Sequence, residues 1–145
     1  MTSEVQHRIT SSVVPIEFHF AVPVRFLGDH AGEGCASIKD WAGRLCAAYR
    51  DREWNLHDEW HFFELSNGGF YMAPANIGRV AVRWHKNRYS DMMGADGFGI
   101  VVTLYALDNL AQRTRDRTVI DRYRQLREFA IEHVEALNIQ RAIDD

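Results

Sequence analysis

Two short aromatic-rich stretches flank an Asn-Gly pair near the middle of the chain, and this pattern predicts a β-hairpin. The stretches run over 60–65 and 70–74, and Asn67-Gly68 lies between them. Asn and Gly both tolerate the positive φ that a tight type I′ turn requires, which makes the pair a strong hairpin signal. We therefore expect Asn67, Gly68 and the following Gly69 to form a structural turn between two antiparallel strands.

A two-residue loop fixes a register for this hairpin and sorts its side chains onto two faces. With Asn67-Gly68 as the loop, Leu65 opposes Phe70, and further pairs follow along the strands. One face then carries Phe63, Leu65, Phe70 and Met72, and the other carries Phe62, Glu64, Tyr71 and Ala73. Both faces hold aromatic side chains, which are usually buried, although an aromatic face can also be open to a partner. We favour burial on both sides.

Alternating apolar residues predict further strands outside this hairpin. Residues 80–85 and 88–93 have the pattern of a second hairpin that turns at Lys86-Asn87. Residues 16–20 alternate with period two, as a short strand or an extended lead-in would. The segment 28–34 holds three glycines and is expected to be a loop.

Three segments have the apolar spacing of helices. The first runs over 34–50, where apolar positions recur at helical intervals: Ile38, Trp41, Ala42, Leu45, Cys46 and Tyr49. Asp96 is expected to cap a second helix, which extends to about Arg113 and is apolar nearly all round, as a central buried helix is. The third runs over 116–138, with an apolar stripe of Val119, Tyr123, Leu126, Ala130, Val134 and Leu137.

Together these elements predict an α+β fold in which two consecutive hairpins form a small antiparallel sheet packed with three to four helices. Residues 1–14 are polar and unpatterned, so we expect a flexible N-terminal tail. Residues 15–145 are expected to form a single domain, with 51–59 as a surface loop. A chain of 145 residues is long enough to bury a sizeable core.

The charge balance narrows the functional classes. The chain has 20 acidic and 17 basic residues and a formal charge of −3. Duplex DNA as long as such a domain carries roughly 20 phosphates, so a protein that imitates DNA is disfavoured. No stretch approaches the roughly 20 apolar residues that span a bilayer, and the N-terminus has no apolar signal-peptide core. We therefore expect no membrane association and a cytoplasmic location.

Candidate sites for catalysis or ligand binding give only weak signals. His57 and His61 could bind a metal in a bent loop, but no second Cys/His cluster completes four ligands, so a solvated loop is favoured. The glycine-rich segment 94–99 could hold a phosphate ahead of a helix, although Asp96 would repel it. Ser66 lacks the surroundings of a catalytic nucleophile, and Cys35 and Cys46 are expected to be small core residues. We expect no catalytic, cofactor-binding or metal-binding residues.

Basic residues concentrate in one part of the chain: Arg113, Arg115, Arg117, Arg122, Arg124 and Arg127. This cluster could contact nucleic-acid phosphates. However, Arg117 and Arg124 each have an acidic residue four positions later, which is typical of a solvated helix face. We favour the solvated face and expect direct DNA binding to be weak or absent.

The sequence over 60–74 is Trp-His-Phe-Phe-Glu-Leu-Ser-Asn-Gly-Gly-Phe-Tyr-Met-Ala-Pro. It closely resembles the stretch that marks the KlcA/ArdB antirestriction family. The likeness covers about residue 20 to the C-terminus, and further similar segments are 22–26, 41–46 with Tyr49, 99–104, 120–123 and 141–144. Family members usually reach the hairpin within a few residues of the first helix, whereas this chain inserts 51–59.

The resemblance implies a protein that is not an enzyme and that is carried by plasmids and other mobile elements. Such proteins relieve the host's type I restriction of incoming DNA. We expect protein–protein interference with subunits of the type I restriction-modification complex, and the oligomeric state is left open. The alternative function is a nucleic-acid-binding accessory protein of a mobile element, which would use the arginine-rich last helix.

Two groups of residues are candidates for contacting such a partner. The first group lies on the hairpin and consists of Trp60, Phe62, Glu64 and Tyr71. The second is the C-terminal pair Asp144 and Asp145, because the apolar stripe weakens after Leu137 and 138–145 is expected to leave the body of the domain. Such tails are commonly disordered and without a role, but this one ends as family members do.

Overall fold

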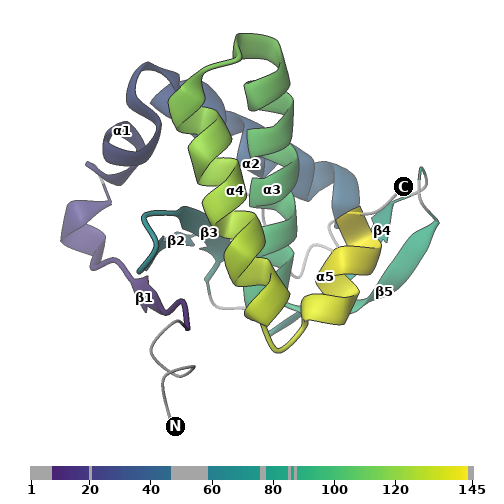
Figure 1. The fold of residues 1–145 in the computed structure, drawn as a ribbon. Coiled ribbons are helices and arrows are strands. Elements are labelled where there is room, and N and C mark those ends of the chain that lie inside the picture. The colour runs from purple at the N-terminus through teal and green to yellow at the C-terminus, as the bar shows by residue number, and fades with distance from the viewer. Residues whose placement is uncertain are drawn as a thin grey trace, which may run out of the picture.

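The computed structural model describes residues 8–19, 21–46, 59–75, 78–84, 86 and 88–143, which form the predicted α+β domain (Figure 1). The strands are β1 (Ser11–Val13), β2 (Trp60–Leu65), β3 (Phe70–Pro74), β4 (Arg79–Trp84) and β5 (Tyr89–Gly94). The helices are α1 (Val22–Leu27), α2 (Ala31–Leu45), α3 (Ala95–Thr114), α4 (Arg117–Glu132) and α5 (Ala136–Ile143). Two 3-10 turns, η2 (Ile16–Phe18) and η3 (Gly28–His30), lie near the N-terminus.

Helix α3 lies at the centre of the molecule and organises the rest of the fold (Figure 1). It packs against α2, α4, α5 and β3. Every residue from Gly97 to Leu104 is buried, which confirms the predicted central helix. An element that is apolar on all sides must be covered on all sides, so the other helices and both sheets assemble around it.

Both predicted hairpins are confirmed, but they form two separate sheets. One sheet has the order β1-β2-β3 and the other consists of β4 and β5, with all pairs antiparallel. The two sheets lie on opposite sides of α3 in the view of Figure 1. Cys46, which was predicted to be helical, is extended and forms an isolated antiparallel bridge with Val82 of β4.

The predicted register of the β2–β3 hairpin is wrong by one residue. Glu64, not Leu65, lies opposite Phe70. The loop contains three residues, because the Leu65 N–H donates to the Gly69 carbonyl at 2.9 Å. Gly68 alone has positive φ, +97°, so the loop has the single left-handed residue of a bulged three-residue turn rather than the two of a type I′ turn. A one-residue slip moves every β3 side chain to the other face relative to β2.

Helix α3 covers the outer edge of β3. Thr103 receives a hydrogen bond from the Met72 N–H at 3.2 Å, and its own hydroxyl is 3.5 Å from the Met72 carbonyl oxygen. Gly99, one turn earlier, lies directly on this strand: a Cβ there would collide with the Met72 carbonyl oxygen and lie 2.5 Å from the Ala73 Cβ. The helix thus satisfies backbone groups that an exposed edge would offer to another chain.

The N-terminal region differs from prediction in three places. The expected flexible tail over 1–14 contains β1, whose backbone pairs with β2 although its side chains are exposed, so no apolar pattern marks it. Residues 16–18 form a 3-10 turn instead of the expected short strand or extended lead-in. The expected loop over 28–34 is helical, since α2 already begins at Ala31. Residues 1–7, 47–50 and most of the predicted loop over 51–59 lie outside the described part of the chain.

The predicted helix over 116–138 is two helices. Asp116 caps α4, accepting hydrogen bonds from the Thr118 and Val119 N–H groups. The chain then leaves the helical conformation at His133 and resumes at Ala136. The bend exposes Val134 and Leu137, which were expected in the buried stripe. It also folds α5 back onto the domain, so that Ile139 and Ala142 are buried in a segment that was expected to leave it.

Candidate functional site

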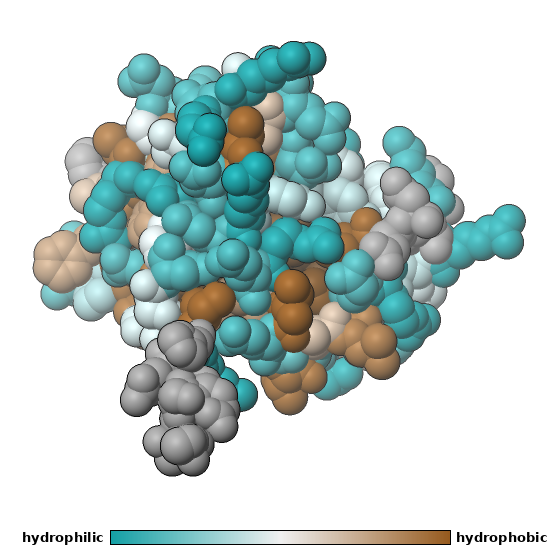
Figure 2. All heavy atoms as spheres, in the orientation of Figure 1, coloured by the Kyte–Doolittle hydropathy of each residue, from teal (hydrophilic) through white to brown (hydrophobic). Residues whose placement is uncertain are grey.

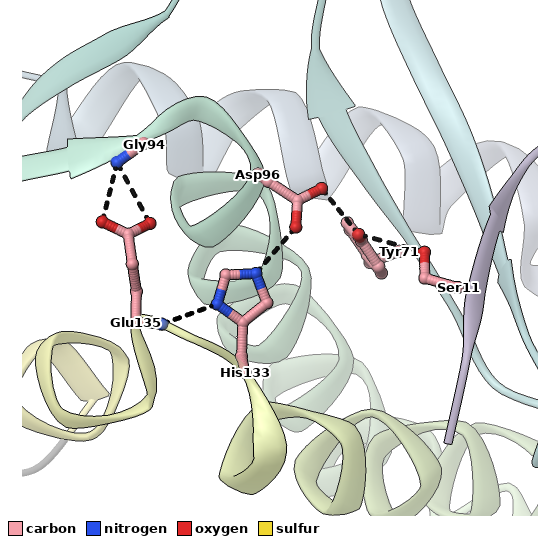
Figure 3. A network of polar contacts seen from close by, with 6 residues as sticks. All are labelled: Ser11, Tyr71, Gly94, Asp96, His133 and Glu135. Atoms are coloured by element: carbon pink, nitrogen blue, oxygen red, sulfur yellow. Dashed lines mark hydrogen bonds and ion pairs between the residues drawn. The ribbon is translucent and has the colours of Figure 1, made fainter. Parts of the chain in front are cut away.

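A network of polar side chains joins β1, β3, α3 and the bend between α4 and α5 (Figure 3). The Tyr71 hydroxyl donates to Asp96 Oδ1 at 2.6 Å and accepts from the Ser11 hydroxyl, whose oxygen is 3.2 Å away. The other Asp96 oxygen is 2.8 Å from His133 Nε2. Burial, together with the Asp96 carboxylate, raises the pKa of Tyr71 well above its usual value. The network therefore holds a neutral tyrosine against a carboxylate.

Both ring nitrogens of His133 are occupied within this network. The Glu135 N–H donates to His133 Nδ1 at 3.0 Å, so this nitrogen must be an acceptor and the proton is assigned to Nε2, which faces Asp96. A general base needs a free nitrogen within reach of a substrate proton. In this arrangement His133 has no free nitrogen. The network of Tyr71, Asp96 and His133 contains residue types that are common in catalytic sites, but here it holds the bend between α4 and α5 in place.

Asp96 does not cap α3, although this role was predicted for it. Gly94 occupies the N-cap position and α3 begins at Ala95, which places Asp96 within the first turn. The Gly94 N–H instead donates to both carboxylate oxygens of Glu135, each at 3.1 Å (Figure 3). Glu135 therefore fills the place where the glycine-rich segment could have held a phosphate, and it adds negative charge where helix N-termini favour it.

The hairpin residues proposed to contact a partner are largely inside the protein. Phe62 and Tyr71 were predicted to share one face of the hairpin, but they lie on opposite faces, and both are buried. Trp60 is buried as well. Tyr71 stacks between Phe63 and Phe129, at ring centroid distances of 4.7 and 5.9 Å. Burial on both sides, the interpretation favoured from sequence, is thus the one that the structure shows.

Among the four hairpin residues proposed to contact a partner, Glu64 is the one whose side chain reaches the surface. It forms an ion pair of 2.8 Å with Arg25 of α1, and both side chains are about half exposed. Such surface pairs contribute little to stability. Asp144 and Asp145 lie outside the described part of the chain.

The turn that carries the recognisable sequence is attached to α4. Asn67 Oδ1 accepts from the Gly69 N–H, and Asn67 Nδ2 donates to the Gln125 carbonyl at 2.9 Å. A Cβ on Gly69 would lie 2.8 Å from the Gln125 Cβ, so the strand and helix touch here. The packing of this turn against α4 therefore explains why Asn67 and Gly69 occupy these positions.

The arginines of the predicted basic cluster mostly bind within the protein. Arg122 Nε donates to the Phe26 carbonyl at 2.9 Å and its Nη1 donates to the Gly68 carbonyl at 3.0 Å. Arg113 pairs with Glu33, and Arg117 with Asp121. These contacts agree with the favoured solvated helix face and leave fewer cations for DNA phosphates.

Other titratable groups show no assembled site. His61 is 3.7 Å from Glu59, and His57 lies outside the described residues. Among the residues that the structure describes, no group of three or more His, Cys, Asp or Glu is placed to hold a metal ion. Cys35 and Cys46 are packed against or in the core, as predicted, and burial raises the pKa of Cys35. Within that same described part, no helix is long and apolar enough to cross a membrane.

Sequence reasoning missed His133 and Glu135 altogether. The sequence placed both residues inside one continuous helix. In such a helix only side chains three or four residues apart are neighbours, and nothing in the pattern brings His133 or Glu135 to the start of α3. No local signal marks the break, because β-branched residues such as Val134 also occur within α4 itself, at Val119 and Ile131.

Comparison with known proteins places this fold in a family. The sequence model of the family described as antirestriction protein matches residues 55–144. Antirestriction protein KlcA of Escherichia coli is 42% identical, over 94% of this chain and 97% of that protein. The uncharacterized protein YafX of E. coli K12 is 35% identical, over 72% of this chain and 66% of that protein.

A solved structure of 38% identity has the same fold. It covers 94% of this chain and 95% of its own, with a TM-score of 0.81. It comes from work reporting that the KlcA and ArdB proteins show a novel fold, and antirestriction activity against type I DNA restriction systems in vivo but not in vitro. Sequence and fold agree over almost the full length, and this chain belongs to the antirestriction protein family.

Proposed function

We propose that this protein relieves type I restriction of incoming DNA in the cell, and that it does so through contacts with protein rather than by catalysis or by imitating DNA. The observation that carries the proposal is the likeness over 94% of the chain, in sequence and in fold, to proteins with that activity. Nearly complete coverage means that the same core, turn and helices are present in both.

The charge distribution supports a protein partner. A formal charge of −3 is far below what a DNA mimic of this size needs, and several acidic side chains are already paired with arginines of the same chain. Both ring nitrogens of His133 are hydrogen-bonded, which argues against acid–base chemistry by this side chain.

Activity in vivo but not in vitro, as reported for the relatives, fits a partner or state that exists only in the working cell. We propose subunits of the type I restriction complex as that partner, contacted in the cytoplasm while the complex translocates along DNA. Asp144 and Asp145 remain candidate contacts.

The test is the plating efficiency of unmodified phage on hosts that differ only in a type I system, with and without this protein. We expect the protein to raise plating on the restricting host towards that on the non-restricting host, and to leave phage already carrying the host modification unaffected. A type II restricting host serves as the specificity control. Restriction that stays at full strength while the folded protein accumulates would refute the proposal.

A further inference from the structure

The bend between α4 and α5 exposes an unusual amount of apolar surface. Ile131, Val134 and Leu137 are 68%, 94% and 77% exposed. Figure 2 shows apolar side chains gathered over this junction, where the lower end of α4 meets α5 in Figure 1. Single exposed apolar residues are ordinary, but a contiguous group around a hollow marks an interaction surface.

A groove extends from this group along the side of α4. It begins as an open apolar hollow of about 360 Å³ between α4 and α5, with Ile131, Leu137 and Ile143 among its walls. Past Arg127 and Ile143 it continues to Tyr123 and Asp108, and then to Ile120 and Arg115. Each hollow shares two lining residues with the next, so the three lie in a row beside α4, and together they are called the groove.

One face of α4 forms the length of this groove. Ile120, Tyr123, Arg127 and Ile131 recur at intervals of three and four residues, so they lie in one row on the helix. This row is distinct from the buried stripe of Val119, Leu126, Phe129 and Ala130. From Ile120 to Ile131 there are eleven steps along the helix, which span roughly 16 Å at about 1.5 Å per residue. This length matches about three turns of a second helix laid into the groove.

The charges on the groove favour an acidic occupant. Neither Arg115 nor Arg127 has an ion-pair partner among the residues that the structure describes, and Arg127 only donates to the Tyr123 hydroxyl. Among the described residues that line the groove, Asp108 is the only one with a carboxylate, and both of its oxygens are hydrogen-bonded by Gln112. A second copy of the chain in the same groove would bring Arg127 close to its symmetry mate, which like-charge repulsion disfavours.

We propose that this groove is the docking surface for an acidic amphipathic helix of a partner protein. The apolar residues of that helix occupy the hollow around Ile131 and Leu137, and its carboxylates face Arg127 and Arg115. Peptides bound as helices in grooves are held in this way, by apolar anchors spaced three and four residues apart, while charge at the rim fixes orientation. The inference rests on the proposed function and assigns a surface to it.

The first experiment measures phage protection by single variants. We expect Leu137→Glu and Arg127→Glu each to lower protection at least about tenfold, as truncating central contacts of an interface does. The matched controls are Val24→Glu on α1, where the side chain is 62% exposed, and Arg83→Glu on β4. Both lie away from the groove and should protect like the parent. Because Leu137 is exposed, its variant should keep the parent melting temperature, and Leu137→Ser provides a second, uncharged change.

The second experiment uses purified full-length protein and two synthetic 16-residue helical peptides. Both carry leucines at i, i+3, i+4 and i+7; one is flanked by glutamates and the other by lysines. We expect the acidic peptide alone to shift the amide NMR signals of residues near Ile131, Arg127 and Leu137, and we expect Arg127→Glu to abolish those shifts. This readout does not depend on restriction.

The outcomes separate the two proposals. If the parent protein fails to protect but binds the acidic peptide in the groove, the proposed function falls and the groove assignment stands. If the parent protects and the groove variants protect equally, the groove is not the docking surface. Equal shifts from both peptides, no shifts from the acidic one, or a dimer in sedimentation that Leu137→Glu dissociates would each overturn the acidic-helix assignment.

Discussion

Tyr71 places its hydroxyl in the interior against a carboxylate, and this sets how the fold should respond to alkaline pH. The hydroxyl donates to Asp96, and burial is the largest cause of its raised pKa. The folded protein keeps the Tyr71 proton at pH values where the unfolded chain, with a tyrosine pKa near 10, has released it. The stabilisation is therefore complete below about pH 10 and is lost progressively above it.

We expect Tyr71→Phe to reduce the pH dependence of stability in alkali. Above pH 10 the free energy of unfolding of the parent should fall more steeply, by up to about 1.4 kcal/mol per pH unit for this one proton. Near pH 7 the variant should be less stable by about 1–2 kcal/mol, because the hydrogen bond to Asp96 is lost while the ring still stacks. Urea unfolding at pH 7, 9, 10 and 11 measures both effects, and parallel alkaline slopes would contradict the assignment.

Gly99 determines how closely α3 approaches β3. Adding a Cβ by Gly99→Ala would push the helix off the Met72 carbonyl, so we expect a loss of about 1–3 kcal/mol despite the better helix propensity of alanine. Gly32→Ala in α2 is the control, because nothing lies within 4 Å of its Cβ position. Gly32→Ala should be neutral or slightly stabilising, and an equally mild effect at Gly99 would mean that the strand and helix are further apart.

Among the secondary-structure elements, the β2–β3 turn and α4 depend on each other. Arg122 connects them, since it donates to the Gly68 carbonyl and also to the Phe26 carbonyl at the end of α1. Carbonyls at loops and helix ends need partners when they are partly buried. One side chain of α4 thus satisfies two other segments.

We expect Arg122→Ala to destabilise the protein by about 1–3 kcal/mol, because two carbonyl groups lose a charged donor. Arg124→Ala, an exposed position two residues later on the same helix, should change stability by less than about 0.5 kcal/mol. Urea unfolding measures both. If the two variants lose the same amount, Arg122 acts through general helix charge and not through the turn.

At the scale of the whole molecule, one hydrophobic core connects both sheets and all the long helices. It includes Trp60 of β2 and Trp84 of β4, which lie in different sheets, as well as α3 residues that contact both. Because the core is continuous around one central helix, unfolding either sheet alone would cost much of the free energy of unfolding the whole domain. Domains of this size usually unfold in one step.

We expect one cooperative unfolding transition. The chain has four tryptophans, and their fluorescence reports on the packing around Trp41 of α2, Trp60 of β2 and Trp84 of β4, whereas far-ultraviolet circular dichroism reports mainly on the helices. The urea midpoints from the two signals should coincide. An earlier fluorescence transition would show that the packing around the tryptophans loosens before the helices unfold.

The local sequence determined the position of many of the secondary-structure elements. The apolar spacing of α3 and the alternation of the two hairpins placed these elements correctly within a few residues, because burial patterns of period 3.6 and period two come from the backbone geometry itself. Asp116, expected only as the start of the last helix, caps α4 through contacts that lie within three residues of it. The run over 60–74 also identified the family before any fold was known.

Tertiary structure decided whatever depends on residues far apart in the chain. The break after α4 is held by Asp96 and Gly94, which bind His133 and Glu135 from about forty residues away. Asn67 of the hairpin turn binds α4 in the same way, across 58 residues of the chain. β1 has no apolar pattern because it pairs through its backbone and its side chains are exposed. No local pattern encodes these long-range contacts, so the bend after α4 and the exposed groove beside α5 could be seen only in the packed structure.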